Sequence, residues 1–334
     1  MRTILSILQA FLFVVSAFSV EDSNFKEWVD RAAVSLTGTA QCSFEPISAQ
    51  ELSVTPSETK RCRDWFDAHV RLTDGDVRKA AFTFSAGGRP LRLLPGDWTV
   101  STGAESDAGA VYKGGKTSYI TLTHRRSGLV ATVEATIYEA FATCEWTVFI
   151  KNAADTASPV LSHVYAADCV LPTGHSSLYF SRGSGADADD FELYRSMTGV
   201  LPMRFTANGG RSASFLPYFN IDGSACGVLM AVGWTGQWLA TVSQRLSGVA
   251  VQAAQETLRG GLDPGETVRS PLVSLTFYEH KNPLKGFNVF RSWETDCVAP
   301  EGTRGITTQG LINEFYRKGS DELVRDIHNL PQAF

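Results

Sequence analysis

The chain lacks the short motifs that most directly indicate a catalytic or metal-binding site. Its six cysteines show no C-x-x-C spacing, so we do not expect a zinc site. The sequence contains neither G-x-S-x-G nor H-E-x-x-H, which removes two common signatures of hydrolases. No Asn-x-Ser/Thr sequon occurs. We therefore assign no catalytic residue, no metal and no cofactor from motifs.

Positive charge is also scarce. The 334 residues include 30 Lys and Arg against 35 Asp and Glu, a net charge of −5, with no basic tract. A nucleic-acid partner would require a positive surface, so we exclude one. Beyond residue 20 no apolar run approaches the roughly 20 residues of a membrane span, so we expect no membrane partner.

The one extended apolar stretch stands at the N terminus. Arg2 precedes an apolar run over residues 4–15, and Ala17-Phe18-Ser19 has small residues two apart, as a cleavage site requires. We expect residues 1–19 to be a signal peptide, removed just before Val20. The mature protein would then be secreted or periplasmic. A membrane anchor is the alternative interpretation.

Export would place the cysteines in an oxidising compartment. They are sparse and without pattern, so the fold should not depend on disulfides. Cys144, Cys169 and Cys226 lie in apolar, strand-like runs, which is typical of buried thiols. The one bridge we predict joins Cys42 to Cys62.

Helical spacing is confined to the two ends of the chain. Apolar residues between 24 and 36 recur at the spacing of one short amphipathic helix. Apolar positions between 311 and 330 predict one or two further short helices, broken near Gly319-Ser320. Residues 40–62 carry no clear pattern.

Between residues 65 and 285 the apolar pattern has a period of two. The turn signals Asp74-Gly75, Ser127-Gly128 and Asp263-Pro264-Gly265 separate strand-like runs, the first of them within residues 65–85. About ten or more strands at short spacing predict an all-β, antiparallel sandwich. We therefore divide the mature chain into a helix and connecting segment (20–64), a sandwich (65–285) and a linker with a helical tail (286–334).

The stretch from residue 178 to 238 holds the best candidates for binding. Aromatic rings stack on the C–H face of a sugar, and carboxylates and guanidinium groups bond its hydroxyls. The candidate substrate-binding residues are Asp189, Asp190, Arg195, Trp234 and Trp238. The alternatives are that both tryptophans belong to the core, that the acidic loop is a solvated turn, and that Arg195 pairs with Asp190.

Other chemistry fits this acidic loop poorly. Calcium needs about six oxygen ligands, and the loop offers three carboxylates. A glycosidase acid and nucleophile flank a bound sugar at about 5–9 Å, which neighbours in one loop rarely achieve.

A succession of motifs resembles the N-terminal domain of the glycoside hydrolase family 36 α-galactosidases, the melibiase-like enzymes. The matching stretches are FTFSAGGRPLRLLPGDW (82–98), CEWTVFIKN (144–152), SGADADDFELYR (184–195), LPYFNID (216–222), GVLMAVGWTGQW (227–238) and GFNVFRSWETDCVAP (286–300). The resemblance covers about residues 75–300. It implies a galactose-mutarotase-like β-supersandwich that leads into a (β/α)8 barrel, where two aspartates hydrolyse terminal α-galactosides with retention.

The sequence departs from the family where the chemistry would be. The family's Lys-Trp-Asp and Asp-Asp-Gly-Trp motifs are both absent, so no catalytic residue carries over. Residues 286–334 would then be the linker and a truncated start of the missing barrel. The resemblance implies that the five candidate residues contact sugar at the barrel's rim.

Three functions remain open at this point. The resemblance favours the non-catalytic N-terminal domain of a secreted α-galactosidase-like hydrolase, and the alternative is a free-standing carbohydrate-binding or scaffold module. An aldose epimerase shares the sandwich type, but His163, His175 and Glu192 show no recognisable acid–base pairing. The expected partner is at most a carbohydrate, an α-galactoside. The linkage and the oligomeric state, a homo-oligomer included, stay open.

Overall fold

The computed structural model describes residues 48–90, 96–108, 113–185, 190–207, 212–279 and 282–299. The expected signal peptide, the helix over 24–36, Cys42 and the tail helices after residue 310 lie outside these ranges.

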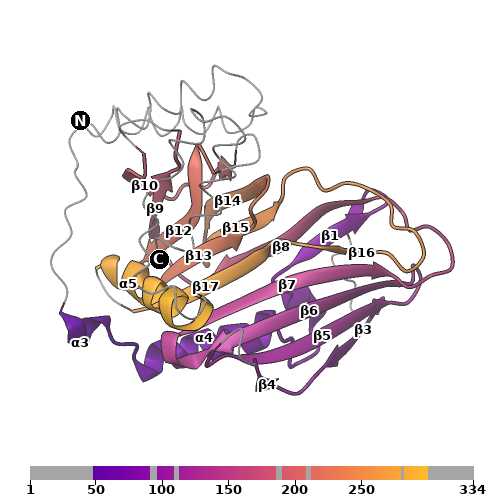
Figure 1. Cartoon of the computed structure of the whole chain (residues 1–334), viewed down its shortest axis with the longest axis horizontal. Helices are drawn as coiled ribbons and strands as arrows, with labels where there is room; N and C mark the ends of the chain where they lie inside the picture. Colours follow the sequence, from indigo (N-terminus) through magenta and orange to yellow (C-terminus); the bar gives the residue numbers. More distant parts are fainter. Residues whose placement is uncertain are drawn as a thin grey trace, which may run out of the picture. The chain divides into compact units, whose positions relative to one another are not determined.

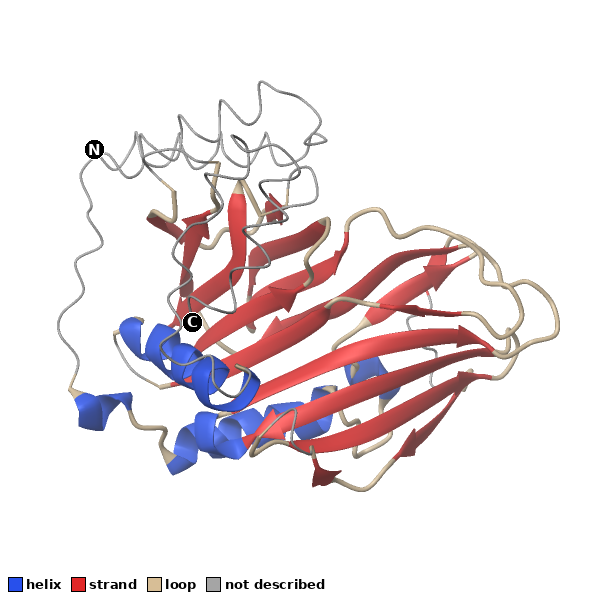
Figure 2. Ribbon diagram, in the orientation of Figure 1, coloured by secondary structure: helices blue, strands red, loops and turns tan. Residues whose placement is uncertain are grey.

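Two antiparallel sheets pack face to face around an apolar core (Figures 1 and 2). The smaller sheet has the strand order β11-β14-β15-β8-β1-β2. The larger has the order β10-β9-β12-β13-β17-β7-β6-β5-β3, with β16 paired to β7 and β4 to β5. The predicted all-β antiparallel sandwich is therefore confirmed.

The elements follow in this order along the chain. The strands are β1 (Thr83–Ala86), β2 (Arg89–Pro90), β3 (Trp98–Thr102), β4 (Ser106–Asp107), β5 (Lys116–His124), β6 (Leu129–Tyr138), β7 (Thr143–Asn152), β8 (Leu161–Leu171), β9 (Ser176–Arg182), β10 (Leu193–Met197), β11 (Met203–Thr206), β12 (Phe215–Gly223), β13 (Gly227–Gly233), β14 (Trp238–Arg245), β15 (Gly248–Gln255), β16 (Thr267–Arg269) and β17 (Leu272–Tyr278). The helices are α3 (Ala49–Leu52), α4 (Pro56–His69), α5 (Leu284–Trp293), the 3-10 turns η1 (Val77–Lys79) and η2 (Glu139–Phe141), and the π-helical turn η3 (Glu294–Val298).

Two of the turns predicted from sequence are formed, one inside a hairpin and one between strands of different sheets. Gly128, with φ +67°, precedes β6 and closes the β5–β6 hairpin. Before β16, Glu266 N donates to Asp263 O at 3.0 Å, and Gly265 has φ +84°. A positive φ is the conformation that glycine adopts without strain. The turn at Gly128 therefore fixes the register of β5 and β6, whereas the turn at Gly265 leads the chain from one sheet to the other.

The period-two interpretation is wrong at its start, because residues 56–69 form helix α4. Thr55 and Glu58 make a capping box: Glu58 N donates to Thr55 Oγ1 at 3.3 Å, and Thr55 N donates to Glu58 Oε2 at 2.7 Å. Pro56 occupies the first turn, where a missing N–H costs nothing. The first strand begins only at Thr83, and Asp74-Gly75 lies in the loop between α4 and η1.

Helix α4 packs against the core side of the larger sheet. The ring of Trp65 lies 5.9 Å from that of Trp146 and 5.8 Å from that of Phe277. Trp146 Nε1 in turn donates to Ala166 O on the opposite sheet at 2.7 Å. One tryptophan thus ties the helix, β7 and β8 together inside the sandwich.

The stretch expected to be a linker begins with a packed helix. Helix α5 lies across β13 and β17 on the outer face of the larger sheet (Figure 1). Phe290, Trp293 and Cys297 form a second apolar cluster there with Tyr138 and Leu229.

The described cysteines are thiols. Cys62, Cys144 and Cys226 are buried, whereas Cys169 is partly exposed. Burial, followed by a hydrogen bond with the Cys62 thiol, raises the pKa of Cys144. The predicted Cys42–Cys62 bridge is wrong, because Cys62 is a free thiol buried beside Cys144.

Candidate functional site

Asp190 and Trp238 are connected by a chain of hydrogen bonds at one end of the sandwich. The Asp190 carboxylate accepts from Ser184 Oγ at 2.7 Å and from Gly185 N at 2.9 Å. Ser184 N donates to Ser212 O at 3.3 Å, and Trp238 Nε1 donates to Ser212 Oγ at 3.1 Å. These bonds hold the β9–β10 loop, the segment before β12 and the first residue of β14 against one another.

The two candidate tryptophans lie in different surroundings. Trp238 is fully buried and packs edge-on against Phe219 in the core. Its ring offers no surface to a ligand, which agrees with the core alternative. Trp234 is half-buried, and the guanidinium of Arg269 lies 5.0 Å from its ring centroid. Asp189 lies outside the described residues.

Arg195 stands on the outer face of the larger sheet, on strand β10. Its Nη2 donates to Ser177 Oγ at 3.0 Å, and its guanidinium carbon lies 5.5 Å from the ring centroid of Tyr179. Burial raises the pKa of the nearby Asp222, and the charge of Arg195 partly offsets that rise. We call these four residues the Arg195 cluster.

The Arg195 cluster has the groups that bond hydroxyls. Arg195 is exposed and Asp222 is half-buried. Strand β9 lies between β10 and β12, so the Ser177 hydroxyl stands between the guanidinium and the carboxyl, and all three groups face one surface. Guanidinium N–H groups donate and carboxylate oxygens accept, which together match the donor and acceptor of a hydroxyl.

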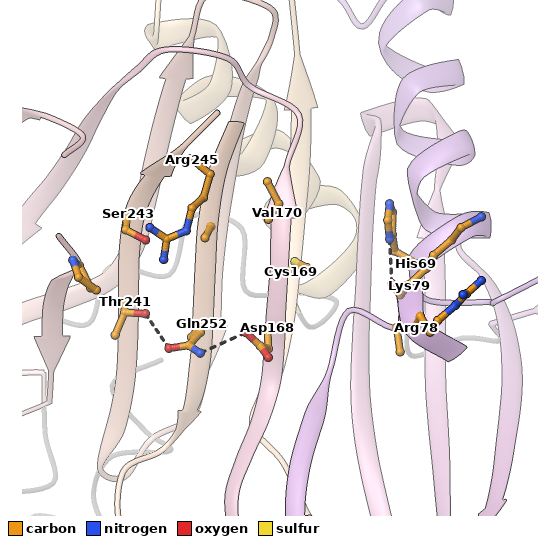
Figure 3. A pocket seen from close by; sticks show the side chains of 13 residues that line it. His69, Arg78, Lys79, Asp168, Cys169, Val170, Thr241, Ser243, Arg245 and Gln252 are labelled. Atoms are coloured by element: carbon orange, nitrogen blue, oxygen red, sulfur yellow. Dashed lines mark hydrogen bonds between the residues drawn. The ribbon is translucent and has the colours of Figure 1, made fainter. Parts of the chain in front are cut away.

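A second concave surface lies on the outer face of the smaller sheet (Figure 3). We call it the sheet groove, and its volume is about 480 Å³. It runs from β14 across β15 and β8 to the end of α4 and η1. Inward residues of these strands, such as Val242 and Val251, are buried, so the alternate residues line the groove.

A polar row crosses three strands in the sheet groove. Thr241 pairs with Gln252, and Gln252 with Asp168, in the strand register. Thr241 Oγ1 donates to Gln252 Oε1 at 3.1 Å, and Gln252 Nε2 donates to Asp168 Oδ1 at 3.1 Å (Figure 3). These bonds fix the orientation of the amide. Further along β14, Arg245 Nη1 donates to Val200 O at 3.2 Å.

The opposite wall of the groove comes from α4 and η1. His69 Nδ1 lies 2.8 Å from Lys79 O. Arg78 pairs with Asp76 at 2.8 Å, and Lys79 pairs with Asp74. Each of these two cations therefore has a carboxylate partner of its own.

Sequence reasoning missed the sheet groove. Along β14 the polar residues Thr241, Ser243 and Arg245 occupy every second position, and this alternation is visible in the sequence. It indicates a polar face of the strand, but the sequence does not show that Asp168 stands beside Gln252.

In the described part of the chain, no group of three or more His, Cys, Asp or Glu could hold a metal ion. None of the helices within the same ranges is both long and apolar enough to cross a membrane.

No family model matches the sequence, and no curated protein matches it. Solved structures do match. The α-galactosidase from Lactobacillus brevis is 13% identical with a TM-score of 0.53, over 66% of this chain and 31% of that chain. The resemblance to α-galactosidases is confirmed as a likeness of fold.

A second similar structure is named as a member of glycoside hydrolase family 36. The GH36 α-galactosidase AgaA from Geobacillus stearothermophilus is 15% identical with a TM-score of 0.53, over 67% of this chain and 33% of that chain. The chain thus spans about a third of the length of these enzymes. At such low identity the likeness establishes the fold and not the activity.

Proposed function

We propose that this chain is a non-catalytic β-sandwich domain of a secreted α-galactosidase-like glycoside hydrolase. The observation that carries the proposal is the fold likeness to GH36 α-galactosidases over two thirds of the chain. The absence of the family's two aspartate motifs from the sequence supports a non-catalytic role.

The proposed partner is an α-galactoside, bound through the Arg195 cluster. One variant of AgaA is solved in complex with raffinose and another in complex with stachyose. On this chain, the exposed guanidinium of Arg195 and the half-buried carboxyl of Asp222 supply the donors and acceptor for galactose hydroxyls. The half-buried ring of Trp234 is the second proposed contact.

The test uses purified residues 20–334. We expect no hydrolysis of a chromogenic α-galactoside, and saturable binding of raffinose that weakens about tenfold in Arg195→Ala. Arg259→Ala, another exposed arginine, is the matched control. Turnover that disappears on replacing one aspartate would overturn the non-catalytic role. Raffinose binding unaffected by Arg195→Ala would overturn the sugar contact.

Secretion requires its own measurement. Expression of the full coding sequence with export should yield a mature protein whose first residue is Val20. A product that retains Met1 in the cytoplasmic fraction would contradict secretion.

A further inference from the structure

We propose that the sheet groove binds a neutral oligosaccharide of at least two hexose units, at a place separate from the Arg195 cluster. The groove lies on the outer face of the smaller sheet, whereas Arg195 stands on the outer face of the larger one. The inference therefore stands on the groove's own geometry and does not require the proposed α-galactoside contact.

The polar row gives the groove fixed hydrogen-bonding groups. The two bonds that join Thr241, Gln252 and Asp168 hold the Gln252 amide in one orientation. Each bond uses part of the amide's capacity, because an amide has two N–H donors and a carbonyl oxygen with two lone pairs. A carboxylate, an amide and a hydroxyl in one line match the alternating donors and acceptors of vicinal sugar hydroxyls.

The surface beside the polar row is apolar on β15 and β8. Ala250 and Val170 pair there in the strand register, Pro202 also lines the groove, and the neighbouring Ser243 on β14 is buried. Val170 is 40% exposed. A surface of this kind accepts the C–H face of a pyranose while the hydroxyls at the ring edge reach the polar row.

The dimensions of the groove favour more than one sugar ring. Thr241 and Arg245 are four residues apart on β14, which corresponds to about 13 Å along a strand. A ligand that touches both the polar row and the Arg245 guanidinium must span that length. The volume of about 480 Å³ lies within the range of pockets that hold small ligands, about 300–1,000 Å³.

The charges in the groove favour a neutral ligand. Arg78 and Lys79 are paired with Asp76 and Asp74 on the same wall. The Asp168 carboxylate stands in the polar row and would repel a phosphate or a uronate that approached it. Arg245 then acts as a hydrogen-bond donor at the far end of the groove and is not part of a cationic site.

The first experiment is a calorimetric titration of the full mature chain with stachyose. We expect a Kd on the order of 0.1–1 mM, weakened about tenfold by Gln252→Ala and by Arg245→Ala. Thr241→Val keeps the shape of the side chain and removes its hydroxyl, so it tests the polar row without opening a cavity. Arg259→Ala, an exposed arginine outside the groove lining, should leave the affinity unchanged.

Two comparisons separate this inference from the proposed function. In Arg195→Ala the groove should still bind stachyose, so loss of all binding in that variant would overturn the groove site. Unchanged affinity in Gln252→Ala, Thr241→Val and Arg245→Ala would overturn it as well, whatever Arg195→Ala does. If none of the three groove variants nor Arg195→Ala changes stachyose binding, both ideas fail.

The charge of the ligand is tested with a trimer of galacturonic acid. We expect it to bind at least tenfold more weakly than stachyose, because each unit carries a carboxylate. Tighter binding of the acidic trimer that is lost in Arg245→Ala would show an anion site and overturn the assignment to a neutral saccharide.

Discussion

Lys285 Nζ lies 2.6 Å from Glu58 Oε1, and the two side chains are 3% and 1% exposed. The same carboxylate caps α4 through Thr55 N and accepts from Glu279 N just after β17. One buried ion pair therefore joins the first turn of α4, the end of β17 and the first turn of α5.

Removing either partner of this pair should destabilise the protein strongly. Lys285→Met would leave the Glu58 carboxylate buried without its cation, and such a loss costs about 3–5 kcal/mol. Urea unfolding followed by circular dichroism measures the free energy. Lys60→Ala is the control, because Lys60 pairs with Asp64 on an exposed surface, where a pair is worth about 0–1 kcal/mol. Equal effects of the two substitutions would contradict the buried pair.

Glu145 should make stability fall as pH rises. Burial raises its pKa to about 7 from an ordinary 4.5, against the hydrogen bond from Tyr138. The folded state therefore binds the proton more tightly than the unfolded state. Stability is greatest below the unfolded pKa, declines through the interval from about 4.5 to about 7, and stays lower above it.

The test replaces this carboxyl with an amide. Glu145→Gln should be more stable than the native protein at pH 8, by at most about 3 kcal/mol, with little or no advantage at pH 4.5. Thermal unfolding at both pH values measures the difference. Glu139→Gln is the matched control: hydrogen bonding to Arg63 lowers the pKa of Glu139, so its removal should reduce stability near neutral pH. If Glu145→Gln raised the stability by the same amount at both pH values, Glu145 would not titrate between them.

Gly286 allows α5 to approach the sheet closely. A Cβ at this position would stand 2.5 Å from Tyr278 Cε1, and Tyr278 is fully buried. Gly286→Ala should push the helix off β17 and cost about 1–3 kcal/mol, despite alanine's better helix propensity. Gly260→Ala is the control, since nothing lies within 4 Å of its added Cβ. If Gly286→Ala were more stable than the native protein, α5 would not pack this closely against Tyr278.

Trp238 should matter for stability, and Trp234 much less. Trp238→Ala removes a fully buried ring and the donor to Ser212, so we expect a loss of about 3–5 kcal/mol. Trp234→Ala removes a half-buried ring stacked on Arg269, and about 1 kcal/mol is expected. Chemical unfolding compares the two. The reverse order of effects would argue against Trp238 as a core residue.

The sandwich could be predicted because alternation is a local property of each strand. In β6 the apolar side chains of Leu129, Ala131 and Val133 all face the core, as a period of two requires. Helix α4 was missed because Trp65 and Phe66 were taken as the start of a strand. The capping-box pattern of Thr55 and Glu58 begins ten residues before Trp65 and was the stronger local signal.

The binding surfaces were harder to predict because they depend on pairing between distant strands. Gln252 and Asp168 are separated by 84 residues in sequence, and only the β15–β8 register brings them within hydrogen-bonding distance. In the sequence, Trp238 cannot be told from a sugar-stacking ring. Its inward orientation follows from the place of β14 in the smaller sheet, where Trp238 pairs with Gln255 of β15. Sequence alone thus identifies which strands exist better than which side chains meet.

The buried pair of Glu58 and Lys285 also bears on the order of events during synthesis. Glu58 leaves the ribosome early, yet Glu279 N and Lys285 Nζ, its partners, emerge more than 200 residues later. A nascent chain that has completed β17 but not α5 would hold this carboxylate without a counter-charge and leave the apolar cluster around Tyr138 uncovered. The native state should therefore become accessible only once α5 has emerged, which delays the final folding step until after β17 is made.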